Sequence, residues 1–331
     1  MSLFVSSQRL RRIVLTAMCV GGLTALGLAQ AQSWPQKPIR VIVNFPPGGA
    51  ADQIARAVAQ PLGEALGQSV VVENRGGANG NIGGEAVAKS AADGHTLLMS
   101  SGGMVSINPH LYNKMPFDPM KDLVPVAAAA RVLVFLEVRP SLQINDFKTF
   151  LDFVKANPGK LNYASGGVGS SAHMSAELFK SMAGIDMAHI PYKGSAPAVN
   201  ALMADESQVM VGNLPPWSAL IKSGKVQALA VTTPKRLPQF PDVPTVSESG
   251  LSGFEFNSWF AMMAPANTPK PIVEKLHAEI SKALADPSIK EQLFGLGLSP
   301  RGTSPDQLAT ELRAQFAKYG ILIRQANITA E

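Results

Sequence analysis

The chain has 331 residues, of which 46% are hydrophobic and 16% charged, so it can bury a core large enough for two ordinary domains. This composition excludes a disordered, a collagen-like or a disulfide-scaffold protein. The net charge of +5 includes Arg9, Arg11 and Arg12; without them, 26 basic residues stand against 24 acidic ones. Such a balance, with no run of like charge, predicts no nucleic-acid partner and no anionic-membrane partner.

The first 31 residues have the three parts of a secretory signal peptide. A basic stretch ends at Arg12, an apolar stretch runs from Ile13 to Leu28, and a small-x-small triplet follows. We expect cleavage after Ala31, by the general or the twin-arginine route, and no stable membrane insertion of the mature chain. The alternative is an uncleaved membrane anchor, although the apolar stretch is shorter than the roughly 20 residues of a spanning helix.

The single cysteine, Cys19, lies inside that apolar stretch, so the mature chain is expected to contain none. A disulfide, a thiolate nucleophile and a cysteine-ligated zinc site are thereby excluded. An exported protein without disulfides favours a periplasmic location.

Strands, glycine loops and helices alternate from residue 39 onward. The β-branched run 39–45 predicts a buried strand, the sequence Pro46-Pro47-Gly48-Gly49 a tight loop, and the apolar spacing after Asp52 a helix to Leu66. The same order repeats, with strands at 69–73 and 95–100 and a helix at 81–90. This alternation is typical of a parallel or mixed sheet.

A second α/β series starts with a helix at 147–157. It continues with strands at 161–165, 187–190, 208–211 and 226–232 and with helices at 172–182 and 195–204. We interpret the extended runs 131–139 and 254–264 as crossings between two lobes, and the helical tail, which includes a helix capped by Ser304, as a return to the first. The sequence therefore predicts that residues 32–132 and 255–331 form lobe 1 and that residues 133–254 form lobe 2.

Residues for several enzymatic chemistries are missing. The five histidines include no i, i+3 or i+4 pair, so no metal site is predicted. Neither a G-x-S-x-G elbow nor a complete phosphate-binding loop is present. Gly167 to Ala172 fits a G-x-G-x-x-A dinucleotide turn, but no acidic residue follows the next strand to hold a ribose. We expect no cofactor and no enzymatic activity; a periplasmic dinucleotide-dependent or hydrolytic enzyme is one alternative.

Three glycine or serine loops follow predicted strands, at 46–49, 101–103 and 166–171. Where such a loop leads into a helix, unpaired backbone N–H groups and the positive end of the helix dipole favour an anion. Ligands of open α/β sheets bind beyond the carboxyl ends of the strands. The pattern indicates a site for a small carboxylate.

Three stretches resemble signature segments of the Bug receptors, the extracytoplasmic solute-binding proteins of the tripartite tricarboxylate transporter family. They are VENRGGANGNIGGEAVAKSAADGHTLLM from Val72, HIPYKGSAPAVNALM from His189 and APANTPKPIVEKLHAEISKAL from Ala264. The resemblance runs from about Trp34 to the C-terminus. It implies a type II periplasmic binding protein fold, with two α/β lobes joined by two crossing strands and the ligand cleft between them. It also implies delivery of the ligand to the membrane subunits of a transporter.

The resemblance also implies which residues bind the carboxylate. They are Phe45, Gly48, Gly49, Asp52 and Ser101 in lobe 1, and Ser165, Gly167, Ser171, His173, Lys193 and Asn213 in lobe 2, with Tyr192 at the rim. Asp52 has an alternative interpretation as a first-turn acid that interacts with its helix dipole, and His173 as a residue that orients its own loop.

Three positions depart from the family pattern. Ala51 stands where a hydroxyl residue is frequent, Met104-Val105 where a Thr-His pair is frequent, and Gly212 where an acidic residue is frequent. From the first two departures we expect a ligand with one carboxylate and a more apolar or aromatic body than citrate or aspartate, and from Gly212 a weaker contact to any ligand amine.

Taken together, these features predict a monomeric periplasmic receptor that captures a small carboxylate by lobe closure and delivers it to a permease. A ligand-sensing partner of a membrane sensor kinase would use the same fold and is the second alternative.

Overall fold

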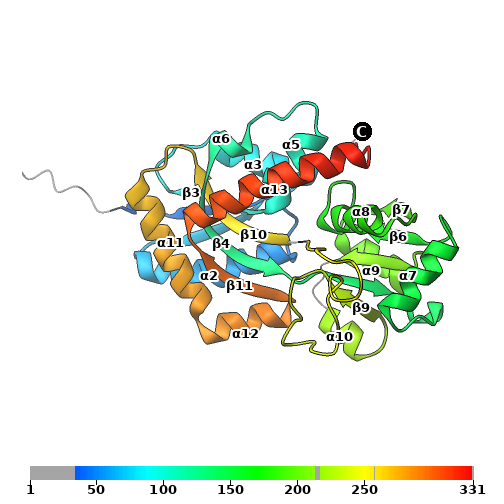
Figure 1. Cartoon of the computed structure of the whole chain (residues 1–331). Coiled ribbons are helices and arrows are strands. Elements are labelled where there is room, and N and C mark those ends of the chain that lie inside the picture. Colours follow the sequence, from blue (N-terminus) through cyan, green and yellow to red (C-terminus); the bar gives the residue numbers. More distant parts are fainter. Residues whose placement is uncertain (1–33, 213–216, 257, 330–331) are drawn as a thin grey trace, which may run out of the picture. The chain divides into compact units, whose positions relative to one another are not determined.

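The computed structural model describes residues 34–212, 217–256 and 258–329 (Figure 1). The expected signal peptide and Asn213 lie outside these residues. From Lys37 onward the chain forms one compact unit, which contains two β-sheets. Among the described helices, none combines the length and the hydropathy needed to cross a membrane.

The first sheet has six strands in the order β11-β4-β10-β3-β1-β2. Its strands β1 (Ile39–Val43), β2 (Val70–Asn74) and β3 (Thr96–Ser101) are parallel. The antiparallel strand β10 (Ser258–Pro265) separates β3 from β4 (Leu123–Val132), and β11 (Leu298–Thr303) forms the edge beside β4. Every residue of β10 is buried, which is expected of a strand with both faces covered.

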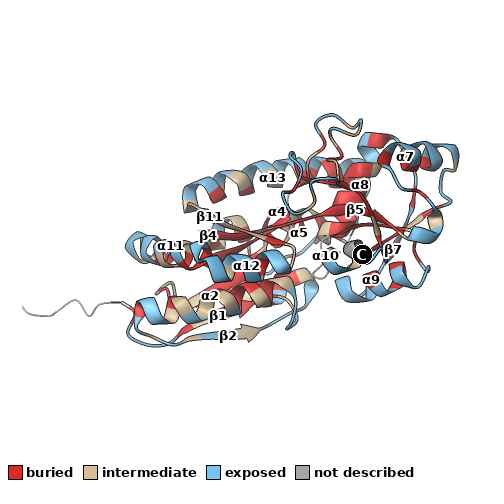
Figure 2. Cartoon of the chain, turned by 90° about the horizontal axis from the view of Figure 1, so that it is seen from below, coloured by how far each residue is buried: buried red, intermediate tan, exposed pale blue. Residues whose placement is uncertain are grey.

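Helices α2 (Ala50–Leu66), α3 (Asn81–Ala88), α11 (Lys270–Ala285) and α13 (Pro305–Gln325) pack against this sheet. One buried cluster joins Ile42 of β1, Leu98 of β3 and Trp259 of β10 to α3 and α13. Figure 2 shows that the buried residues concentrate on the strands and on the helix faces turned toward them. The shorter elements on this half are η2 (Ala78–Gly80), α4 (Gly102–Ser106), α5 (Asn108–Leu111), α6 (Pro119–Asp122) and α12 (Pro287–Gly295).

The second sheet has five strands in the order β7-β6-β8-β5-β9. Parallel strands β6 (Asn162–Ser165), β7 (Ala188–Pro191) and β8 (Val209–Gly212) adjoin the antiparallel pair of β5 (Phe135–Val138) and β9 (Gln227–Val231). Aromatic residues fill its core, where the Phe150 and Phe179 rings stack at 6.2 Å. The surrounding elements are η3 (Pro140–Leu142), α7 (Phe147–Ala156), α8 (Ser171–Ala183), α9 (Ser195–Met203) and α10 (Trp217–Lys222).

The chain leaves the first sheet after Val132, enters the second at Phe135, and returns between Val231 and Ser258. The run expected as one crossing at 131–139 is thus the end of β4 followed by β5. The end of α13 also reaches the second sheet, because Tyr319, Leu322 and Ile323 belong to the same buried cluster as Phe179 (Figure 1). Two covalent connections and one helix end therefore join the halves.

Candidate functional site

The loop after β1 is fixed by the buried side chain of Asp52. Its carboxylate accepts hydrogen bonds from the Gly48 N–H (2.9 Å), from Arg56 Nε (3.0 Å) and from Asn74 Nδ2 (3.0 Å). Burial by itself raises the pKa of Asp52, but these hydrogen bonds outweigh it and leave the pKa below its ordinary value. Asp52 is therefore an ionised acceptor for its own loop and for β2.

The glycines that Asp52 supports are accessible. Gly48 is exposed with φ +81°, and Gly49, also exposed, is the N-cap of α2. Phe45 is half-buried and contacts Phe260 of β10 edge to face, with ring centroids 6.1 Å apart. The loop thus places exposed glycine backbone beside an aromatic surface at the N-terminus of a 17-residue helix, with the Gly48 N–H already donated to Asp52.

Ser101 lies at the same edge of the first sheet. It ends β3, which is parallel to β1, so the loops after the two strands lie side by side. Ser101 is half-buried and is the N-cap of α4, but its hydroxyl makes no capping hydrogen bond. The structure therefore brings the predicted residues of the first half together.

Ser165, Gly167 and Ser171 surround one loop of the second half. The Ser165 hydroxyl accepts a hydrogen bond from the Gly167 N–H (3.1 Å) and lies 2.6 Å from His189 Nε2. Gly167 has φ +117°, a conformation that favours glycine. Ser171 opens α8, and its Oγ lies 2.9 Å from Oγ of Ser258 in the first sheet.

His173 is buried and accepts a hydrogen bond at Nδ1 from the Gly169 N–H (3.0 Å). It acts on its own loop, as the alternative interpretation anticipates. Lys193 is exposed after β7, in a loop joined to the Ser165 loop by the hydrogen bond from the Gly194 N–H to the Gly166 carbonyl (3.2 Å). Asn213 lies outside the described residues.

The loop after Ser165 approaches the first half closely. A Cβ on Gly169 would lie 2.4 Å from Leu111 Cδ1 of α5 and 3.3 Å from Asn79 Nδ2 of η2. Asn79 in turn donates to the buried Asn108 Oδ1 at 2.8 Å. Asn79 and Gly169 were not among the predicted site residues. Asn79 and its neighbour Ala78 both have a left-handed backbone conformation, with φ of +51° and +46°, and residue type alone does not predict such a conformation.

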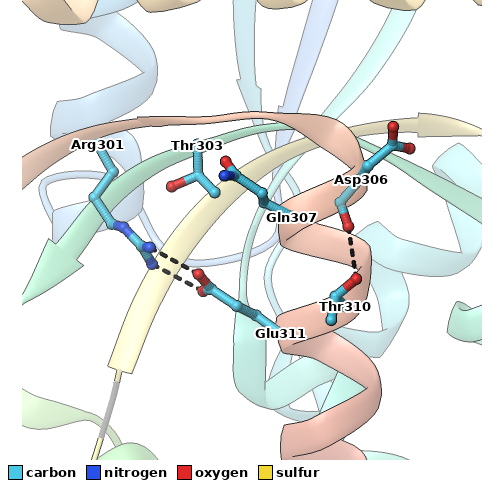
Figure 3. A pocket seen from close by; sticks show the side chains of 6 residues that line it. All are labelled: Arg301, Thr303, Asp306, Gln307, Thr310 and Glu311. Atoms are coloured by element: carbon cyan, nitrogen blue, oxygen red, sulfur yellow. Dashed lines mark hydrogen bonds and ion pairs between the residues drawn. The ribbon is translucent and has the colours of Figure 1, made fainter.

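A cavity of about 510 Å³ lies elsewhere, between β11 and the start of α13 (Figure 3). Arg301 and Glu311 line it and pair at 2.8 and 2.9 Å, so the cation there is already neutralised. Its remaining lining residues are Thr303, Asp306, Gln307 and Thr310. None of the predicted site residues lines this cavity, and its acidic side chains disfavour a carboxylate.

Known proteins share this arrangement. Residues 54–328 match the tripartite tricarboxylate transporter family receptor. This chain belongs to that receptor family. BugT of Bordetella pertussis is 38% identical to it over 89% of this chain and 91% of BugT. The prediction of a Bug receptor is therefore confirmed, and proteins of this family are periplasmic solute-binding receptors.

Two solved structures of similar proteins support the fold of this Bug receptor. A protein of R. palustris solved with adipate is 36% identical, with a TM-score of 0.82, and the match covers 90% of this chain and 99% of that one. MatC from Rhodopseudomonas palustris, solved with bound malate, is 32% identical, with a TM-score of 0.78 over 88% of this chain and all of MatC. The predicted fold, that of two-lobed periplasmic binding proteins, is confirmed.

The departures at Ala51 and at Met104-Val105 do not support the expected apolar ligand of this receptor, which stays a prediction. Ala51 is 1% exposed, and Met104 and Val105 are fully buried. Met104 and Val105 pack in the core cluster of the first sheet with Phe117 rather than at the strand ends. These residues therefore fill the core of the receptor and give no information about the body of its ligand.

Replacing Asp52 by asparagine is expected to destabilise this Bug receptor at pH 7 by roughly 2 kcal/mol, because hydrogen bonds to a buried charged acceptor are lost. The pKa of Asp52 is lowered on folding, so its stabilisation is present above the unfolded-state pKa near 4 and disappears as pH falls through the folded-state pKa. Urea unfolding at pH 7 and pH 3 measures both effects.

The matched control is Asp152→Asn, which removes an exposed ion pair with Lys148. That control should cost less than about 1 kcal/mol. Equal losses in the two variants would contradict the anchoring role assigned to Asp52.

Proposed function

We propose that this chain is a periplasmic receptor that binds a small carboxylate between its two halves and delivers it to the membrane subunits of a transporter. Its lobes are residues 32–132 with 255–331, and residues 133–254. The observation that carries the proposal is the pair of glycine loops at parallel strand ends, one after β1 and one after β6, each followed by a helix N-terminus. Backbone N–H groups in this position bind anions without a basic side chain.

The binding residues in this proposal are those of the two loops and their supports. Phe45, Gly48 and Gly49, whose loop Asp52 holds, contact the ligand from the first half together with Ser101 of the neighbouring loop. Gly167, Ser171 and Lys193 contact it from the second half, with Ser165 and His173 holding the loop 166–171. Relatives solved with adipate and with malate make a dicarboxylate the first class to test.

Closure of the two halves around the ligand signals occupancy to the permease. Export is proposed to remove residues 1–31, and the mature receptor works as a monomer. The intact mass of protein recovered from a periplasmic extract tests the cleavage site.

The binding test uses the mature protein with adipate, malate, citrate and benzoate. A dicarboxylate bound with a dissociation constant near 1 μM, supplied at a hundredfold excess over that value, stabilises by about 2.7 kcal/mol. For a protein of this size we expect a rise in Tm of roughly 5 °C or more. Isothermal titration then gives the affinity. The proposal fails if none of the four carboxylates binds.

A further inference from the structure

Two histidines, one buried (His173) and one half-buried (His189), lie beside the loop 166–171 of the second half. The His173 and His189 rings stack at 4.0 Å with an interplanar angle of 6°, and His189 stacks on Tyr163 at 4.8 Å. His173 and Tyr163 are at most 5% exposed. His189 is half-buried, so the three rings form a group of nearly parallel rings between β6, β7 and α8 with His173 and Tyr163 in the interior.

Each imidazole is connected to the loop backbone. Because the Gly169 N–H donates to His173 Nδ1, that nitrogen carries the lone pair and the proton of the neutral ring is on Nε2. His189 Nε2 contacts Ser165 Oγ at 2.6 Å, and this hydroxyl accepts from the Gly167 N–H. Two of the loop amides are thus held through histidine.

The stack is suited to neutral rings. Burial lowers the pKa of His173 and of His189 to about 4. The charged groups that face the rings are Glu177 and Lys180 of α8, which pair at 2.9 Å, while the Tyr163 hydroxyl donates to Glu177 at 2.6 Å. At neutral pH both imidazoles are therefore uncharged, and the charges of the nearby Glu177 and Lys180 neutralise each other.

Gly169 connects this stack to the other half of the molecule. It is buried, has φ +76°, and leaves no room for a Cβ beside Leu111 of α5. Gly169 is thus held by His173 on one side and lies against Leu111 on the other, so loss of the hydrogen bond from the Gly169 N–H to His173 Nδ1 would free the residue that contacts the first half.

We propose that His173 and His189 are positioning residues that, as a neutral stacked pair, hold loop 166–171 in the conformation that binds the carboxylate. The ligand part of this inference rests on the proposed function, whereas the positioning of Gly169 does not. Protonation of His173 at Nδ1 removes the acceptor of the Gly169 N–H and places a charge against the second ring.

Two substitutions at position 173 separate the hydrogen bond from the ring. His173→Asn places a side-chain oxygen near the position of Nδ1, whereas His173→Gln places its polar atoms nearer to that of Nε2. We expect Gly169 amide exchange, measured by NMR at pH 7, to accelerate at least tenfold in H173Q and less than threefold in H173N. Adipate affinity should weaken in the same order, with the Gly184 amide at the far end of α8 as the unchanged reference.

The histidine tautomers and pKa values are measured on the same samples with nitrogen-15 histidine. The wild-type protein should show His173 protonated at Nε2, with loss of Gly169 protection as pH falls toward 4. His189→Gln should raise the pKa of His173, because the second ring no longer shields it from water.

The inference is overturned if H173Q keeps wild-type protection at Gly169, or if His173 carries its proton on Nδ1. Failure of the wild-type protein to bind any of adipate, malate, citrate and benzoate would instead count against the proposed function, and the exchange data would still decide the role of His173.

Discussion

Replacing Glu137 by glutamine is expected to stabilise the protein at pH 8 and to remove a loss of stability that accompanies rising pH. Glu137 lies on β5 in the interior of the second sheet, opposite Met210 of β8 and Ala228 of β9. It is fully buried, and neither carboxylate oxygen has a hydrogen-bond partner among the described residues. Burial therefore raises its pKa well above the ordinary value.

The sign of the pH effect follows from this shift. Between the unfolded-state pKa, near 4.3, and the raised folded-state pKa, the folded protein binds one proton more than the unfolded chain. The free energy of unfolding therefore decreases with pH across this range, by about 1.4 kcal/mol per pH unit for this group. Glutamine has nearly the same shape and stays neutral, so E137Q lacks this contribution and its advantage over wild type grows with pH.

Urea unfolding at pH 5, 6.5 and 8 measures the difference. The control is Glu291→Gln, at an exposed position on α12, which should change stability by less than about 0.5 kcal/mol at every pH. If the E137Q protein is less stable than wild type at pH 8, Glu137 must be charged and paired in the folded protein. That result would contradict its burial without a hydrogen-bond partner among the described residues.

Replacing Gly169 by alanine should cause the largest loss of both stability and binding. Left-handed backbone costs an L residue roughly 1–2 kcal/mol, and forcing a methyl group into a packed contact costs about 1–3 kcal/mol more. Leu111, which the new Cβ would meet at 2.4 Å, is 6% exposed and packs in the large cluster of the second sheet, so it has little freedom to move aside. We expect urea unfolding to show a loss of about 2–5 kcal/mol and adipate binding to weaken at least tenfold.

Gly184 provides a matched control on the same helix. It is the C-cap of α8 with φ +62°, and a Cβ there meets no atom within 4 Å. Gly184→Ala should therefore lose only the backbone contribution of about 1–2 kcal/mol, with adipate affinity unchanged. In a Leu111→Ala background, the cost of G169A should fall by 1 kcal/mol or more, measured as a double-mutant cycle. Equal effects of G169A and G184A would show that the contact with Leu111 carries no energy.

Several elements were predictable because their patterns are local. The buried parallel strands β1, β3 and β6 read as short apolar runs, and each lies within one residue or two of its predicted range. The helix start at Ser304 was equally predictable, and Ser304 forms a capping box with Gln307. The helix expected from residue 147 begins there, after Asp146, which accepts a hydrogen bond from the Thr149 N–H.

Two strands of the first sheet were not predicted. The segment LVPVAAAARV of β4 is rich in alanine, which favours helix, and becomes a strand because β10 and β11 flank it from more than a hundred residues later. The edge strand β11 contains Pro300 and Gly302, which disfavour a strand assignment but are tolerated at an edge.

The amino-acid sequence by itself determined the order of strands, glycine loops and helices, and with it the family, because hydrophobic periodicity and turn residues act over a few positions. Only the tertiary structure decided which side chains are buried and which groups they contact. It joined Asp52 to Asn74 across 22 residues and Ser171 to Ser258 across 87, placed Met104 and Val105 in the core and stacked His173 on His189. It also enclosed Glu137 with no hydrogen-bond partner among the residues that the structure describes. Hydrogen bonding, burial and pKa depend on sheet register and on the approach of the two halves, and these are set by packing among distant segments.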